Sequence, residues 1–302
     1  MSRPMTPRLR YVLRMTLAIL IALALLTPLL LGASFAAFLT LTGCTRGGDP
    51  AALNLPHEAV SFPSAEFDRP TPAYLILAEG TEQPAPVVIV APTAAAARGD
   101  RLHEIAVYQR AGYHVLTYDS RACVGAAPMA LGGLEARQVA DALAFLETRP
   151  EIDPSRIAVH GFSAGGAAAL LAAADLPQIR AVVAEGGYHD FADELAHNSA
   201  GFGVFGDLFR FGVGLTYRAI TGQALDSLRP IDAVRAIAPR PILLIYGTNE
   251  PGLRGALQMA ALGPHITLWQ VDGAGHGDYL AAAPEEYARR AADFLADAFA
   301  ES

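Results

Sequence analysis

The segment from Gly161 to Gly165 has the sequence Gly-Phe-Ser-Ala-Gly and carries the clearest chemistry in the chain. A G-x-S-x-G pattern is typical of a nucleophilic serine on a sharp strand-to-helix turn, because the two glycines give that turn its clearance. An apolar, strand-like run at Arg156–His160 precedes it, and a helix-forming run at Ala167–Leu171 follows. The alternative is a tight turn without a catalytic role. We favour the nucleophile, which predicts attack by Ser163 on a carbonyl carbon.

A serine nucleophile needs a general base, and a histidine oriented by a carboxylate serves this purpose. The chain has eight histidines, and two fall late enough for the order serine, acid, histidine. His265 precedes the predicted strand Ile266–Val271, which places it at the sheet edge opposite the serine. His276 follows the same strand, at the carboxyl edge where such sheets gather their sites. His276 is therefore the predicted base.

The orienting acid should also follow a strand at the carboxyl edge. Glu250 comes shortly after the predicted strand Ile242–Tyr246 and meets this condition. Three other carboxylates compete for the role, namely Glu185, Asp190 and Asp272. A further alternative is that Glu250 only solvates a loop. The predicted triad is Ser163, Glu250 and His276.

Two backbone N–H groups should stabilise the oxyanion, each by roughly 3 kcal/mol in the transition state. Ala164 begins the helix after the serine, where free N–H groups and the positive end of the helix dipole lie. The second donor should come from the loop after the predicted strand Val87–Val90. Pro92 has no N–H to give, so we predict Thr93 as the partner of Ala164.

Composition excludes several other chemistries. The 302 residues contain no lysine, so a Walker phosphate loop, a lysine Schiff base and a Ser–Lys dyad are all excluded. Zinc signatures of the H-E-x-x-H or paired C-x-x-C kind are absent, and we expect neither a metal nor an organic cofactor. The two cysteines, Cys44 and Cys123, cannot make a disulfide scaffold, and we interpret Cys123 as a packing or lining residue. The G-x-G-x-x-G match at residues 201–206 lacks a preceding strand, so we do not interpret it as a dinucleotide site.

Short apolar runs alternate with helical stretches through most of the chain, as in a mostly parallel sheet with helices on both faces. The predicted strands are Ala73–Leu77, Val87–Val90, His114–Tyr118, Arg156–His160, Ala181–Ala184, Ile242–Tyr246 and Ile266–Val271. The predicted helices include Leu102–Ala111, Leu134–Glu147 and Tyr287–Phe299. The predicted fold class is therefore α/β, with one domain of about 250 residues.

Residues 58 to 300 resemble the α/β-hydrolase superfamily and are similar to dienelactone-hydrolase-like and prolyl-oligopeptidase-type catalytic domains. The resemblance rests on Asp119-Ser120-Arg121, on Arg156 to Gly166, on Gly247 to Glu250 and on Gly273 to Asp278. It implies an eight-stranded-type sheet and serine hydrolase activity without a cofactor. The sequence departs from the family pattern in three places: Ala91-Pro92 replaces the usual His-Gly, Glu250 the usual aspartate, and Arg121-Ala122-Cys123-Val124 the usual Arg-Gly-x-Gly.

The interval 191–239 is longer than a crossover between two strands needs. It contains several aromatic residues among glycines. One interpretation is an ordinary crossover helix with its apolar face on the sheet. The other is a lid-like insertion that roofs an apolar substrate pocket.

The N-terminal segment 1–46 is predicted to attach the chain to a membrane. Residues 15–45 carry no charge, and about 20 apolar residues suffice to cross a bilayer. We favour an uncleaved anchor. The alternative is a lipoprotein signal, because Leu41-Thr42-Gly43-Cys44 resembles a lipobox. Residues 47–70 are predicted to form a tether and an entry strand, and 71–302 the hydrolase domain.

The formal net charge of −8 combines five arginines and no acid in residues 1–46 with −13 in the remainder. The positive-inside bias then places the four arginines that precede the apolar stretch in the cytoplasm and the acidic domain outside it. A domain this acidic repels phosphate backbones, so nucleic acid is not expected as a partner. We predict hydrolysis of a small-molecule ester or related acyl compound through an acyl-enzyme. The alternatives are a peptidase, a thioesterase, an acyltransferase or a non-catalytic binding domain of this fold.

Overall fold

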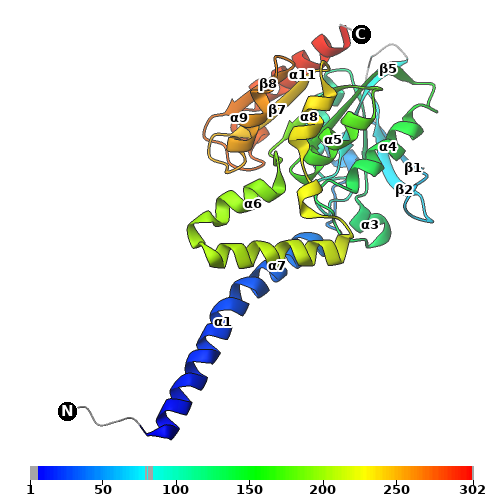
Figure 1. Cartoon of the computed structure of the whole chain (residues 1–302). Helices are drawn as coiled ribbons and strands as arrows, with labels where there is room; N and C mark the ends of the chain where they lie inside the picture. Colours follow the sequence, from blue (N-terminus) through cyan, green and yellow to red (C-terminus); the bar gives the residue numbers. More distant parts are fainter. Residues whose placement is uncertain (1–5, 79, 81–83, 301–302) are drawn as a thin grey trace.

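In the computed structural model, which describes residues 6–78, 80 and 84–300, eight strands form one sheet in the order β1-β2-β4-β3-β5-β6-β7-β8 (Figure 1). The strands are β1 His57–Phe62, β2 Thr71–Ile76, β3 Ala85–Ala91, β4 His114–Tyr118, β5 Ile152–Phe162, β6 Ile179–Glu185, β7 Ile242–Gly247 and β8 Ile266–Val271. β2 pairs antiparallel with β1 and β4, and the other neighbours are parallel. This confirms the predicted mostly parallel sheet. The strand β1 lies inside the segment 47–70.

Helices cover both faces of the sheet. The helices are α1 Pro7–Thr40, α2 Leu102–Arg110, α3 Arg121–Gly125, α4 Glu135–Leu146, α5 Ala164–Asp175, α6 Phe191–Ser199, α7 Val204–Thr221, α8 Pro230–Ile237, α9 Leu253–Ala260, α10 Tyr279–Ala282 and α11 Pro284–Ala300. One core layer joins the sheet to α4, α5, α8 and α9, and the other joins it to α2 and α11. The unbroken apolar strands follow from this double cover, because both of their faces are buried.

The interval 191–239 divides into two parts. The helix α8 packs on α5 through buried side chains such as Val234 and Ile237, as a crossover helix does. Before it, α6 and α7 form an arm that projects from the body of the domain (Figure 1). The residues 200–206, with the G-x-G-x-x-G match, form a short 3-10 turn and the start of α7.

The long helix α1 leaves the body next to α7 (Figure 1). The two helices approach so closely that a Cβ on Gly32 would lie 2.0 Å from the carbonyl oxygen of Phe209. In the same way, a Cβ on Gly212 would lie 2.2 Å from the carbonyl oxygen of Leu29. Small residues therefore set this contact, since they allow two helix backbones to meet.

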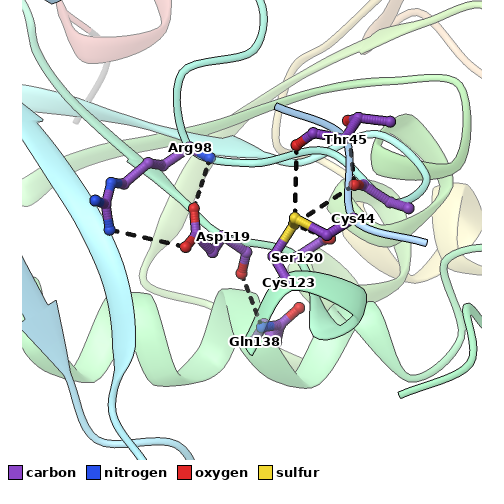
Figure 2. Close-up of a disulfide and its surroundings, with 8 residues drawn as sticks. Cys44, Thr45, Arg98, Asp119, Ser120, Cys123 and Gln138 are labelled. Atoms are coloured by element: carbon purple, nitrogen blue, oxygen red, sulfur yellow. Dashed lines mark hydrogen bonds and ion pairs between the residues drawn. A yellow bond between two sulfur atoms is a disulfide. The ribbon is translucent and has the colours of Figure 1, made fainter. Parts of the chain in front are cut away.

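The two cysteines form a disulfide between Cys44 and Cys123, across 79 residues of sequence. Figure 2 shows this bridge between the chain that leaves α1 and the start of α3. The interpretation of Cys123 as a packing residue is therefore wrong. It failed because the pairing depends on two segments that only the fold brings together. A sulfur in a disulfide cannot also carry a lipid, so the structure does not support the lipoprotein alternative.

Candidate active site

Ser163 stands on the turn between β5 and α5 with φ 56° and ψ −119°, a backbone conformation that non-glycine residues rarely adopt. The turn is tight on both sides. A Cβ on Gly161 would lie 2.1 Å from the carbonyl oxygen of Gly165, and one on Gly165 would lie 2.6 Å from the carbonyl oxygen of Ala91. Both glycines of the motif are therefore required by the backbone, as expected for a nucleophile elbow.

His276 lies on the loop after β8, and its Nε2 is 3.2 Å from Ser163 Oγ. This is the distance at which an imidazole can take a hydroxyl proton. The end of β7 packs against the same loop, since a Cβ on Gly247 would lie 2.1 Å from the carbonyl oxygen of Ala274. His265 lies at the opposite end of β8, where its Nε2 is 3.4 Å from the carbonyl oxygen of Val234.

Glu250 lies behind the imidazole, with Oε2 3.9 Å from His276 Nδ1. The side chain of Glu250 is buried, whereas that of His276 is about half exposed. The same carboxylate oxygen accepts hydrogen bonds from the backbone N–H of Gly247 at 3.3 Å and from the hydroxyl of Tyr279 at 2.5 Å. Burial, reinforced by the neighbouring carboxylate, raises the pKa of Tyr279, so its hydroxyl remains a donor. The three predicted residues therefore meet at one edge of the sheet.

Phe162 and Gly186 also pack against the imidazole, and neither was predicted as a site residue from the sequence. The ring of Phe162 lies 4.7 Å from that of His276, centroid to centroid. The guanidinium of Arg101 lies over the ring of Phe162, 4.2 Å from its centroid. Gly186 has φ 57°, and a Cβ there would lie 2.9 Å from His276 Nδ1 and 2.3 Å from the hydroxyl of Tyr279. The position of Phe162 inside the serine motif is the one sequence feature that could have indicated a role at the site.

The competing carboxylates are engaged elsewhere or lie apart. Glu185 is fully buried at the end of β6, where it pairs with Arg101 and His160 and accepts a hydrogen bond from Tyr287. Burial opposes ionisation, yet His160 and Arg101 together hold the pKa of Glu185 below its ordinary value. Asp190 caps the N-terminus of α6 and pairs with Arg229. Asp272 is exposed.

The loop that carries Thr93 lies against the start of α5, since the carbonyls of Ala91 and Pro92 face Gly165. Within this loop the carbonyl of Thr93 accepts a hydrogen bond from the N–H of Ala96. The other predicted donor, Ala164, is the first residue of α5. Both predicted oxyanion residues therefore stand at the same end of α5 as the serine.

The Asp119-Ser120-Arg121 segment supports this loop. One carboxylate oxygen of Asp119 accepts the N–H of Arg98 at 2.9 Å, and the other lies 3.7 Å from the guanidinium of Arg98 (Figure 2). The N–H of Ser120 donates to the carbonyl of Ala96 at 3.0 Å. Within the described part of the chain, no three His, Cys, Asp or Glu side chains are grouped so as to hold a metal ion.

The prolyl oligopeptidase family matches residues 101–302, which is more than half of the chain. The chain belongs to this family. The match contains the elbow and both loops that carry Glu250 and His276. It confirms the predicted resemblance, and the chain is a hydrolase with the α/β-hydrolase fold.

Solved structures share this fold over most of the chain. The esterase Pf2001 of Pyrococcus furiosus is 20% identical, with a TM-score of 0.67 over 85% of this chain and 96% of that one. The α/β hydrolase GrgF from Penicillium sp. sh18 is 20% identical, with a TM-score of 0.63 over 82% of this chain and 100% of that one. Among curated proteins, the thiohydrolase apmlB of Arthrinium phaeospermum is 38% identical over 87 residues, 27% of this chain and 28% of that relative's length.

Proposed function

We propose that this family member is a membrane-anchored serine hydrolase that cleaves carboxylic esters or related acyl bonds through Ser163, His276 and Glu250. The observation that carries the proposal is the 3.2 Å contact between His276 Nε2 and the hydroxyl of Ser163 on its strained turn. The buried carboxylate of Glu250 completes the arrangement, since it can stabilise the imidazolium that forms when the histidine takes the proton.

The reaction would proceed in two halves. Ser163 Oγ bonds to the acyl carbon as its proton passes to His276 Nε2, and the oxyanion is stabilised by the N–H groups of Ala164 and Thr93. The proton then moves to the leaving alcohol as its bond to carbon breaks, which leaves an acyl-enzyme. Water attacks this ester, His276 accepts the water proton, and the return of that proton to Ser163 releases the acid.

We also propose that α1 anchors the domain outside the cytoplasm. Among the described residues, α1 is the one helix whose length and composition suit a membrane span. Four arginines precede the apolar stretch and one, Arg46, follows it, and this excess on the N-terminal flank favours a cytoplasmic N-terminus. The disulfide supports the same orientation, because disulfides persist in oxidising compartments and are rare in the cytosol. Protease digestion of intact cells or spheroplasts should therefore degrade the domain.

Labelling with a fluorophosphonate probe tests the catalytic part of the proposal. We expect the full chain in detergent to be labelled on Ser163, and we expect Ser163→Ala to remain unlabelled. His276→Asn should slow labelling at least a hundredfold, because the hydroxyl loses its general base. His265→Asn is the matched control and should react as the wild type does. A folded wild-type chain that does not react would favour a non-catalytic binding domain.

A thioester is the second candidate substrate, because the curated relative is a thiohydrolase. The same residues would cleave it, with a thiol as the leaving group in place of an alcohol. Matched oxygen and thiol esters of one acyl group separate the two possibilities. A kcat/KM for the thioester more than tenfold above that for the oxygen ester would assign the thioesterase function. Peptide amides belong in the same panel, since the family includes peptidases by its name.

A further inference from the structure

The helix α1 and the arm formed by α6 and α7 enclose an apolar groove of about 430 Å³. Its walls include Pro28, Leu31 and Phe35 of α1 and Leu195, Phe205 and Phe209 of the arm. The volume falls within the roughly 300–1,000 Å³ that small-molecule sites occupy. We call it the α1–α7 groove. One of its two walls thus belongs to the N-terminal helix, outside the hydrolase domain.

The position of the groove along α1 sets its depth in a bilayer. With Arg14 at the cytoplasmic boundary, a rise of about 1.5 Å per residue places Pro28 about 21 Å and Phe35 about 32 Å further along the helix. The hydrocarbon core of a bilayer is about 30 Å thick. The groove therefore lies at the level of the outer leaflet, where acyl chains end at their headgroups.

The arm itself has an apolar surface that no other part of the described chain covers. Exposed apolar side chains stand at or just before the start of α7, namely Phe202, Val204 and Phe205. Two more, Phe211 and Leu215, lie one helical turn apart further along α7. The exposed fraction of Phe202 is 69%. Contiguous exposed apolar side chains of this kind mark interaction surfaces, and those next to a membrane-crossing helix suit the bilayer interface.

The end of α1 also reaches the walls of the candidate active site. The carbonyl of Thr40 accepts the N–H of Met129, and Ala36 shares a core cluster with Leu131. The next residue, Gly132, lies against Ala164 and Ala167 at the start of α5. In Figure 1 the helix α1 meets the body at the side where α3 and α6 follow their strands, which is the carboxyl edge of the sheet. The membrane side and the catalytic side of the domain coincide.

We propose that the α1–α7 groove binds one acyl chain of an ester that is dissolved in the outer leaflet, while the exposed side chains of the arm insert into the same leaflet. The chain would lie between α1 and the arm, and its ester group would reach Ser163 at the carboxyl edge. This inference rests on the proposed function and narrows its substrate to lipid-like acyl esters. The residues that line the groove are apolar apart from Asn198 and Ser199, and none of them is charged, so we assign the groove to the acyl portion.

Photocrosslinking tests occupancy without turnover. The full-length Ser163→Ala variant is reconstituted in phosphatidylcholine–phosphatidylglycerol vesicles that contain ethyl hexadecanoate with a diazirine near the end of its chain. We expect labelled peptides from α1 and also from the groove face of the arm, including Leu195. Labelling of α1 alone would overturn the proposal, because any membrane helix reacts with lipid. Crosslinks between two copies through α7 would assign the face to self-association and would also overturn it.

Chain-length kinetics test the role of the groove in catalysis. Leu195→Trp fills the groove from the arm, and Leu31→Trp fills it from the exposed surface of α1. We expect each variant to lower kcat/KM for p-nitrophenyl hexadecanoate at least tenfold relative to p-nitrophenyl acetate. Leu257→Trp on α9 is the matched control, since that side chain is exposed and does not line the groove. It should leave the ratio unchanged.

The two experiments fail in different ways. Equal losses for both esters, or no loss for either, would overturn the acyl-chain assignment while the serine hydrolase proposal stands. A chain that does not react with fluorophosphonate but still crosslinks hexadecanoate through Leu195 would keep the groove as a lipid site and refute the hydrolase.

Discussion

Replacement of Glu250 by glutamine isolates the charge of the candidate acid, because the amide has nearly the same shape. The amide oxygen can still accept from Gly247 and Tyr279, so the loop should keep its geometry. What is lost is the attraction between the carboxylate and the imidazolium of His276. At the observed 3.9 Å this attraction is about 4 kcal/mol for an effective dielectric constant of 20 and about 1 kcal/mol in water. Glu250 is buried but His276 is half exposed, so we expect a value between these limits.

In rate this corresponds to a decrease of kcat between about fivefold and a thousandfold, since each 1.4 kcal/mol is a factor of ten. The assay is single-turnover acylation with p-nitrophenyl acetate, followed by the release of p-nitrophenol. Asp272→Asn is the matched control and should change the acylation rate less than twofold. Glu250→Gln at the wild-type rate, with a large loss in Asp272→Asn, would refute the assignment and move the acid to Asp272. Thermal unfolding of both variants checks that the fold is retained.

Three further outcomes are expected. Gly186→Ala and Gly273→Ala should each destabilise the fold by about 1–2 kcal/mol, because both positions have positive φ. Only Gly186→Ala should abolish turnover, since of the two added Cβ atoms only the one at position 186 would displace the imidazole. Equal losses of kcat in the two variants would contradict this. Gly212→Leu should separate α1 from α7 and speed tryptic cleavage of the arm at least tenfold in micelles, whereas Gly214→Leu, with open space around it, should not. Although burial opposes its ionisation, the ion pairs of Glu185 with His160 and Arg101 lower its pKa below 4.5 in the folded state, so its contribution to stability is full above pH 4.5 and is lost as the pH falls through the folded value. The free energy of unfolding, measured with urea between pH 3 and 6, should therefore depend less steeply on pH in Glu185→Gln.

The sequence was sufficient for the parts of the structure that depend on local patterns. The runs His114–Tyr118 and Ile266–Val271 coincide with β4 and β8. β4 is buried along its whole length, whereas the edge strand β8 exposes Thr267 and Gln270. The placement of Glu250 and His276 at one edge followed from the rule that sites gather where parallel strands end.

The features that the sequence did not predict depend on contacts between distant segments. Cys44 and Cys123 become neighbours only after the chain beyond α1 has been laid along the loop after β3, where the N–H of Thr45 donates to Ala95. The requirement for glycine at position 186 arises from a ring and a hydroxyl almost a hundred residues away. Neither has a local pattern in the sequence.

The carboxyl edge of the sheet lies on the same side of the domain as α1. If α1 holds that edge against a bilayer, the candidate site binds ester molecules that diffuse in the plane of the membrane and not those in the surrounding solution. Turnover should then follow the mole fraction of the ester among the membrane lipids. Diluting the substrate with inert phospholipid would slow the reaction, even though its total concentration in the vessel is unchanged.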